Sequence, residues 1–365
     1  MKIRVYSDLH LYINVEDIDR YDSTELLDLK DKIITDPVDM LVFCGDLTHK
    51  VYSTDDIRFV NTMKFVASVR DICNTTNTIF RIIKGTSTHE GKIIEVLQEM
   101  YDGDPILKCF TEVAYEQINN LVFRYLPEPY FDNYTNFYTY AFSRVADITF
   151  FHGTIDGVIP FLKQTDNPTN LPKSVLMKSE DFITNTNLFS VGGHIHKYIN
   201  IANKIFYTNS LTTHGFADVN NIKGYMEFTI DNDKNWDYKY IKNNSAPNYY
   251  SIEIENIHTK RKEDLQSILG NTLLKLKSYD KIRFILTGDR DINAMSNIHF
   301  LRNLTKKYSI KIEQKLEEVE DYSKMDEESD FFSDNNISIE DKISRLVEER
   351  YGLKLTNEEI RKVIT

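Results

Sequence analysis

The sequence predicts an α/β fold in which two β-sheets pack together between layers of helices, followed by a small α+β domain and C-terminal helices. In the first half, short apolar runs alternate with helical stretches, which is typical of layered α/β proteins. From about residue 121 the apolar runs become shorter and follow one another closely, which predicts further strands that are mostly antiparallel. A polar segment at residues 233–247 then marks the boundary to the smaller domain.

The first half contains three predicted strands, each followed at once by polar residues. These strands cover residues 3–7, 40–45 and 79–85. Residues 56–72 carry apolar side chains at helical spacing, so we expect a helix between the last two strands. Its apolar face could pack on its own sheet or join a helix bundle between two copies of the chain, and the sequence leaves both open.

From about residue 121 the sequence predicts shorter strands, which together with the earlier ones imply a two-sheet sandwich. The strands cover residues 121–126, 148–152, 188–192, 204–209 and 223–230. Loops at strand ends commonly carry binding and catalytic residues on a rigid scaffold. Residues 1–235 are therefore expected to form one sandwich domain with its motifs on loops at the ends of strands.

The remaining third of the chain divides into three predicted parts. Residues 248–316 alternate strands and helices and predict a compact α+β domain. Residues 317–336 are acidic and polar without periodicity, which is typical of a flexible linker. Residues 337–365 predict short helices with an apolar face that this segment cannot bury by itself. We expect that face to bind a partner through Ile343, Leu346, Val347, Ile360 and Val363.

The composition is that of an ordinary globular protein. Hydrophobic residues make up 41% of the 365 residues and charged residues 27%. No apolar run approaches the roughly 20 residues that a membrane-spanning helix needs, and the three cysteines are widely spaced. We therefore expect reduced thiols, no signal peptide, no membrane contact and a cytoplasmic location. Frequent Asn and Lys hint at a phage genome, in which case the location would be the host cytoplasm.

The net charge of −12 limits how the chain can bind nucleic acid. Acidic residues number 56 and basic residues 44, which argues against a surface that holds DNA by charge alone. A nuclease is not excluded by this charge. Metal ions in a carboxylate-rich site supply local positive charge, and a partner protein can supply more.

Asp and His residues follow five of the predicted strands. They are Asp8, His10, Asp46, His89, His152, His194 and His196. Each motif alone is weak, because an Asp-x-His triplet or a Gly-Asp pair is usually a turn or a cap. A His-x-His pair is a better signal of metal binding. Taken together at the ends of apolar runs, these residues predict a shared site for Mn²⁺, Fe²⁺ or Zn²⁺, because imidazole and carboxylate ligands suit such ions.

The order of these motifs resembles the calcineurin-like metallophosphoesterase superfamily, and the resemblance covers residues 8–196. The matching motifs are Asp8-x-His10, Gly45-Asp46, His89-Glu90, His152-Gly153 and Gly193-His194-x-His196. Within the superfamily the chain is similar to SbcD-type DNA-repair nuclease subunits, whose partner is an SMC-like ATPase of the SbcC type. This narrower resemblance rests on His49 three residues after Asp46, on the α+β domain that follows, and on the linker with terminal helices.

The resemblance implies a sandwich of the metallophosphoesterase type followed by a DNA-capping domain and an ATPase-docking segment. It also implies two divalent metal ions, with Mn²⁺ first and Mg²⁺, Fe²⁺ or Zn²⁺ as alternatives. Water activated between the two ions would hydrolyse a phosphodiester. The implied ligands, with Asp46 bridging, are Asp8, His10 and His196 for the first metal and His152 and His194 for the second.

The resemblance further assigns residues that act on the substrate. His89 would donate a proton to the leaving 3′-oxygen or orient the phosphate, and His49 would position the phosphate. As an alternative, His49 is a surface or capping residue. The family carries Asn directly before the His of the third motif, whereas Thr88 stands there in a loop that is two residues longer. A hydroxyl is a poorer ligand than an amide, so we expect a weaker second metal, an extra water or the use of Thr86.

Three functions remain open from the sequence. The first is a DNA nuclease, a double-strand exonuclease and single-strand endonuclease that works as a homodimer with its ATPase in repair or recombination. The second is an independent phosphatase or cyclic-nucleotide phosphodiesterase, which would have no need of the domains after residue 235. The third is a scaffold subunit that has lost catalysis, and the missing Asn is its one support.

Overall fold

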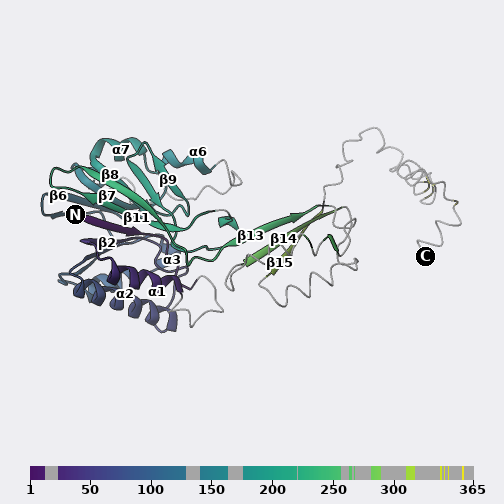
Figure 1. The fold of residues 1–365 in the computed structure, drawn as a ribbon, viewed down its shortest axis with the longest axis horizontal. Coiled ribbons are helices and arrows are strands. Elements are labelled where there is room, and N and C mark those ends of the chain that lie inside the picture. Colours follow the sequence, from purple (N-terminus) through teal and green to yellow (C-terminus); the bar gives the residue numbers. More distant parts are fainter. Residues whose placement is uncertain are drawn as a thin grey trace.

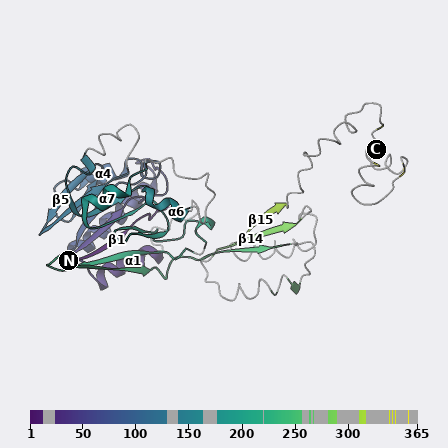
Figure 2. The same ribbon diagram turned by 90° about the horizontal axis from the view of Figure 1, so that it is seen from above.

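The computed structural model describes residues 1–12, 24–128, 140–162, 176–219, 221–255, 263–264, 267, 281–288 and 310–316, with single residues 338, 341, 344 and 356. These residues form two six-stranded sheets and one three-stranded sheet (Figures 1 and 2). The predicted linker at 317–336 lies outside the described residues. So do all five residues predicted to bind a partner, Ile343, Leu346, Val347, Ile360 and Val363.

The first sheet has a parallel centre and an antiparallel edge, in the order β12-β11-β1-β2-β3-β4. Helices connect its parallel strands, as the alternating sequence pattern predicts. Its strands are β1 (Lys2–Tyr6), β2 (Met40–Cys44), β3 (Ile79–Ile83), β4 (Leu107–Phe110), β11 (Gly224–Ile230) and β12 (Trp236–Lys242). The helices are α1 (Thr24–Thr35), α2 (Ile57–Thr75), α3 (Ser87–Glu90) and α4 (Ile93–Met100).

The second sheet has the order β5-β6-β7-β8-β10-β9 and is parallel at its centre. The predicted antiparallel arrangement is therefore wrong for the pairs β6–β7, β7–β8 and β8–β10, and within this sheet only the outer pairs β5–β6 and β9–β10 are antiparallel. The reason is that the long connections between β6, β7 and β8 return the chain to the same end of the sheet. The strands are β5 (Ala114–Ile118), β6 (Leu121–Leu126), β7 (Ala146–His152), β8 (Thr186–Gly193), β9 (Tyr198–Ile201) and β10 (Ile205–Thr208). The predicted strand at 223–230 is antiparallel to its neighbours, but it lies in the first sheet as β11.

Strand β12 lies in the polar segment that the sequence assigns to a domain boundary. It pairs with β11 along its whole length, from Ile230 opposite Trp236 to Gly224 opposite Lys242. Its side chains alternate between half-buried and exposed, because an edge strand covers the core with only one face. The first sheet therefore extends past residue 235.

The two six-stranded sheets pack face to face between two layers of helices, which confirms the predicted two-sheet α/β sandwich. Side chains such as Val42, Phe123 and Phe150 fill the space between the sheets. Helices α1, α2 and α4 cover the outer face of the first sheet. Short helices η3 (Asp156–Val158), α6 (Ile159–Leu162) and α7 (Ser179–Asn185) lie on the other side, over the second sheet (Figure 1).

Helix α2 confirms the helix predicted at 56–72. Phe65, Val66 and Val69 are buried against the first sheet, so this helix packs on its own domain. Ile57 and Val60 near its start are exposed. Among the described residues, every helix is too short or too polar to cross a lipid bilayer.

The third sheet is parallel and consists of β13 (Tyr249–Ile254), β14 (Lys281–Gly288) and β15 (Ile310–Leu316). These strands lie within residues 248–316, where the sequence predicts alternating strands and helices. The sheet contacts η5 (Phe216–Asp218), where the Phe216 ring lies 5.0 Å from the ring of Tyr249. The Arg283 guanidinium lies 4.9 Å from the same Phe216 ring.

A buried guanidinium connects the first sheet to helix α1. Arg4 in β1 is fully buried and donates to the Glu227 carboxylate of β11 at 2.7 Å. It also donates to the carboxylate of Asp36 at 3.0 Å and to the carbonyl oxygens of Lys32 and Asp36. Because all of these partners are acceptors, the charge is fully satisfied inside the protein.

We predict that Arg4→Met lowers the free energy of unfolding by about 3–5 kcal/mol, because it leaves a buried carboxylate without its main partner. Urea unfolding followed by circular dichroism measures the loss. Arg70→Met is the matched control, since the Arg70–Asp104 pair is only partly buried and its removal should cost less than that of Arg4. Equal losses in the two variants would contradict the anchoring role of Arg4.

Candidate metal centre

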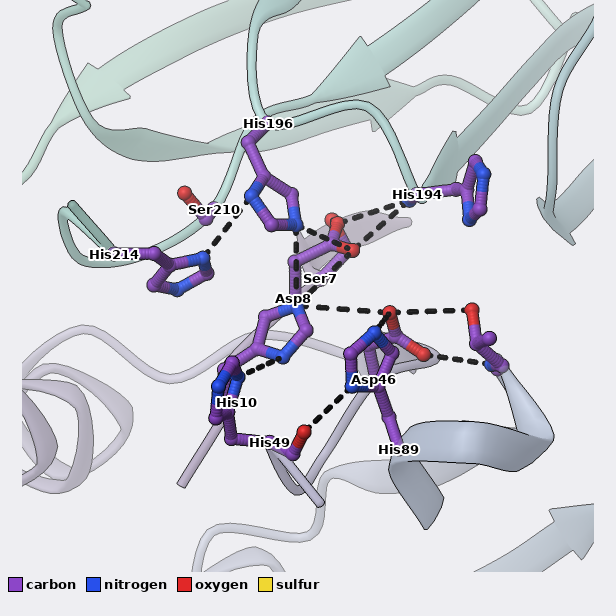
Figure 3. Close-up of polar contacts among 12 residues, drawn as sticks. Ser7, Asp8, His10, Asp46, His49, His89, His194, His196, Ser210 and His214 are labelled. Carbon is purple, nitrogen blue, oxygen red and sulfur yellow. Dashed lines mark hydrogen bonds and ion pairs between the residues drawn. The ribbon is translucent and has the colours of Figure 1, made fainter. Parts of the chain in front are cut away.

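The predicted Asp and His residues meet at one edge of the sandwich, beyond the carboxyl ends of strands from both sheets (Figure 3). The first sheet contributes residues after β1 and β2 and from helix α3, which follows β3. The second sheet contributes the end of β7 and the turn after β8. Parallel strands point the same way, so their ends deliver side chains to a common place. Residues brought together are Asp8, His10, Asp46, His49, His89, His152, His194 and His196.

The backbone is strained at four of these positions. The backbone angle φ is positive at each of them: 51° at Asp8, 44° at His10, 53° at Asp46 and 92° at His194. Residues other than glycine rarely adopt positive φ, although Asp, Asn and His tolerate it better than most. Such conformations persist only where the surrounding structure imposes them, and they concentrate at functional sites. The strain directs four side chains into the same small volume.

Glycines allow the two sheets to approach each other here. A Cβ atom on Gly193 would lie 2.6 Å from the carbonyl oxygen of Cys44 and 2.7 Å from Oδ2 of Asp8. Gly45 has a φ of 82°, and a Cβ atom there would overlap the ring of His152. The close approach of the two sheets therefore requires glycine at both positions, directly before Asp46 and directly before His194.

The first group of ligands comprises Asp8, His10, Asp46 and His196. Nε2 of His10 lies 3.1 Å from Nε2 of His196 and 3.6 Å from Oδ2 of Asp46. Oδ1 of Asp8 lies 3.5 Å from Nε2 of His196 and accepts the backbone N–H of His194 at 3.0 Å. Four side chains that could each offer a ligand atom to a metal ion therefore face one another in this group.

The second group comprises Asp46, His152 and His194. Nε2 of His152 lies 3.4 Å from Oδ1 of Asp46, and its Nδ1 donates to the carbonyl oxygen of Cys44 at 2.7 Å. That hydrogen bond leaves Nε2 of His152 without a proton and directed at the site when the ring is neutral. Nδ1 of His194 lies 3.7 Å from Oε1 of Glu128, and Nε2 of His194 is buried without a hydrogen-bond partner among the described residues.

The structure does not bring Thr88 to the cluster. Thr88 is exposed within helix α3 and forms no hydrogen bond with the site residues described above. Thr86, which precedes the helix, takes its place: its N–H donates to Oδ1 of Asp46 at 2.6 Å. The Thr86 hydroxyl lies 3.3 Å from Oδ2 of Asp46 and 3.5 Å from Nε2 of His152.

His89 and His49 stand at the open side of the first group. Nδ1 of His89 donates to the carbonyl oxygen of His49 at 2.6 Å, so its Nε2 faces the site, 3.9 Å from Oδ2 of Asp46. Nδ1 of His49 lies 3.4 Å from Nδ1 of His10. His49 is thus part of the cluster through both its ring and its backbone. The His89 side chain is 31% exposed, so it can be reached from solvent.

Burial and charge set the protonation of these groups. Burial, with the nearby His196, lowers the pKa of His10 to about 3, and burial with His152 lowers that of His194 to about 4. Burial opposes the ionisation of Asp8, but the hydrogen bond and charge of His196 outweigh it and hold the pKa at about 2. Neutral imidazoles and ionised carboxylates are the forms that bind metal ions.

His152 behaves differently from the other histidines. Burial favours its neutral form, but the carboxylates of Asp46, Asp8 and Glu128 together raise its pKa well above the ordinary value. A proton on His152 compensates for the carboxylates when no cation is bound. Binding of a divalent cation would replace that proton, because the nitrogen that holds a metal cannot also hold hydrogen.

The sequence reasoning missed three residues of this site. His214 follows β10, and its Nδ1 lies 3.1 Å from Nδ1 of His196. Glu90 is buried under Asp46 and accepts the backbone N–H groups of Leu47 at 2.7 Å and Gly85 at 2.6 Å. Burial and the charge of Asp46 raise the pKa of Glu90 to about 8. Glu128 follows β6 and faces His194. The sequence does contain a signal for each of them. Glu90 stands directly beside His89, and Glu128 and His214 are polar residues that follow apolar strands.

The residues present fit divalent cations. Asp8, His10 and Asp46 each place a ligand atom within 4.8 Å of the others, as do Asp46, His152 and His194. Asp46 belongs to both groups. Mixed His and Asp donors at such separations match ions whose bonds to ligands are about 2.0–2.2 Å. The buried, unpartnered Nε2 of His194 is a donor atom that an ion would satisfy.

Comparison with known proteins adds little to this geometry. No family model matches the chain, and no curated protein is similar to it. A solved crystal structure aligns with 66% of this chain and 98% of its own, with 13% identity and a TM-score of 0.39. A TM-score this low carries no argument about fold or function. The case for the site therefore depends on its own residues.

We predict that Mn²⁺ at about 100 times its dissociation constant raises the Tm by roughly 5–10 °C, because each bound ion adds about 2.7 kcal/mol to the native state. Asp46→Asn should lose most of this shift, since Asp46 contributes to both groups. Thermal unfolding with and without a chelator measures it. Asp104→Asn, far from the site, is the control and should keep the shift. A shift in Asp46→Asn as large as in the wild type would contradict the shared role.

Proposed function

We propose that the chain is a metal-dependent phosphoesterase that hydrolyses DNA phosphodiesters. The observation that carries this proposal is the pair of His and Asp groups that share the buried carboxylate of Asp46. Two ion sites with a common carboxylate suit a reaction in which charge develops on both the attacking and the leaving oxygen. The proposal includes the calcineurin-like metallophosphoesterase fold that the motif order suggests.

The residues of the site would divide the work as follows. Asp8, His10 and His196 would hold one cation, His152 and His194 would hold the other, and Asp46 would contact both. Mn²⁺ fits this donor set best, with Mg²⁺, Fe²⁺ or Zn²⁺ as alternatives. When bound, two such cations activate water and neutralise charge on the phosphate. Thr86, in place of Thr88, would supply the neutral oxygen beside the second cation, next to Asp46 and His152.

His89 would act on the leaving group. Its Nδ1–H is fixed by the carbonyl oxygen of His49, so Nε2 is the nitrogen left to meet the substrate. In the imidazolium form the ring also carries a proton on Nε2, and transfer of that proton to the leaving oxygen would neutralise the negative charge there and leave His89 neutral with its proton on Nδ1. The same carbonyl contact sets the orientation of the ring. The His49 ring, which lies beside those of His10 and His89, would contact the phosphate.

Two parts of the proposal rest on features outside the site. These are DNA as the substrate and an SMC-like ATPase as the partner. The parallel sheet β13–β14–β15 follows the sandwich, where a DNA-capping domain would stand. A net charge of −12 means that metal ions or a partner must help to hold DNA. We propose that the segment at 337–365 docks on the ATPase, and that two copies of the chain work together in DNA repair or recombination.

We predict that the protein with Mn²⁺ degrades a labelled linear duplex, and that Asp46→Asn lowers the rate by at least roughly 100-fold, as loss of a transition-state contact does. Gel electrophoresis of the products measures the rate. Hydrolysis of para-nitrophenyl phosphate is measured in parallel. Cleavage of the small ester without cleavage of DNA, alone or with the ATPase, would favour the phosphatase. Mn²⁺ binding without either activity would favour the scaffold.

We predict that His89→Ala keeps both metal ions and lowers kcat on DNA by about 100-fold, because general acid catalysis commonly contributes 10²–10⁴-fold. Metal content measured by mass spectrometry and single-turnover cleavage separate the two effects. Thr88→Ala, one residue away on the same helix and exposed, is the matched control and should cleave at the wild-type rate. Normal turnover in His89→Ala would remove His89 from the mechanism.

A further inference from the structure

His214 is in direct contact with the candidate site, but the proposed mechanism gives it no role. It follows β10 in the sequence and is far from the five motifs. Its ring packs edge-on against two rings of the first group, with centroids 4.4 Å from His10 and 4.5 Å from His196. Its Nδ1 lies 3.1 Å from Nδ1 of His196, as drawn in Figure 3.

The two nitrogens of His196 face different partners. Nε2 faces the first group, 3.1 Å from Nε2 of His10 and 3.5 Å from Oδ1 of Asp8. Nδ1 faces away from that group, toward His214. A nitrogen that binds a metal carries no proton, so a neutral His196 that used Nε2 as its ligand atom would carry its proton on Nδ1. That proton would then be donated to Nδ1 of His214.

We propose that His214 is a positioning residue of the first metal site, which accepts the Nδ1–H of His196 and so presents Nε2 of His196 to the cation. This inference rests on the proposed metal-dependent function. Metal-bound histidines commonly donate their other N–H to an acceptor that fixes the tautomer and the ring orientation, and loss of that acceptor typically costs 10–100-fold in metal affinity. His214 would itself carry its proton on Nε2.

The segment that carries His214 also holds the backbone of His196. Asn221 and Lys223 both donate to the carbonyl oxygen of His196, the latter at 3.1 Å. Asp218 accepts the backbone N–H of His214 at 3.0 Å and pairs with Lys223 at 3.0 Å. One loop thus contacts His196 on its ring and on its carbonyl group. This double contact orients the residue more tightly than a single side-chain hydrogen bond would.

A ligand role for His214 itself is the competing interpretation, because His10, His196 and His214 also place nitrogen atoms within 4.8 Å of one another. The geometry favours the positioning role. The atom of His196 that faces His214 is not the atom that faces Asp8 and His10.

The test compares His214→Asn with His214→Leu. The side-chain oxygen of Asn stands near the position of Nδ1 in His and can accept the same proton, whereas Leu fills the space without accepting. Calorimetric titration with Mn²⁺ should show affinity at the tighter site reduced about 10–100-fold in His214→Leu and largely restored in His214→Asn. Both variants should bind as many ions as the wild type, and thermal unfolding in chelator checks that both are folded.

Several outcomes would overturn the inference. Equal Mn²⁺ affinity in wild type and His214→Leu would show that the contact does not support the site. Loss of one whole equivalent of Mn²⁺ in both variants would make His214 a ligand instead. If His214→Leu does not fold, ¹⁵N spectra of the wild type loaded with Zn²⁺ decide: a proton on Nδ1 of His196 supports the inference and a bare Nδ1 contradicts it. A wild-type protein that binds no Mn²⁺ would overturn the proposed function as well.

Discussion

The buried carboxylate of Asp46 is the interaction on which the site depends. It lies 3.4 Å from His152 of the second sheet and 3.6 Å from His10 of the first, so it joins the two halves of the sandwich. Its placement requires a left-handed backbone, a glycine before it and the N–H of Thr86. Burial alone would favour its neutral form, yet the charges of the neighbouring histidines hold its pKa far below the ordinary value. The fold therefore maintains a buried negative charge that a cation can use.

The loop after β10 connects this charge to the third sheet. His214 contacts His196, and two residues later Phe216 packs against Tyr249 and Arg283. The hydroxyl of Thr213 donates to the carbonyl oxygen of Pro247 at 2.7 Å. A displacement of β13 would therefore act on the segment that carries His214, which contacts His196 of the first group. These contacts form a continuous physical path from the third sheet to the candidate metal centre.

The sequence predicted the central strands and most residues of the candidate site, because both follow from local patterns, but it missed the edge strands β4, β5, β9 and β12. An apolar run followed by Asp or His identifies a strand end, and each of the seven strand-end residues proposed as ligands or proton donor lies in the cluster. Strand direction in the second sheet could not be predicted in this way, because it depends on the path of the connections. His214 and Glu128 were missed for a related reason: each stands alone in the sequence, and only the three-dimensional fold brings it to His196 or His194.

Oxygen atoms of Thr86 and Glu128 surround the second group. Thr86 brings its hydroxyl to Asp46 and His152, and Glu128 brings a carboxylate to within 3.7 Å of His194. Burial raises the pKa of Glu128, and one of its oxygens has no hydrogen-bond partner among the described residues. A buried carboxylate in this state is costly unless a cation lies near it. The second group thus has a hydroxyl and a carboxyl group beside it, and the carboxyl group, when ionised, would strengthen the attraction for a divalent ion.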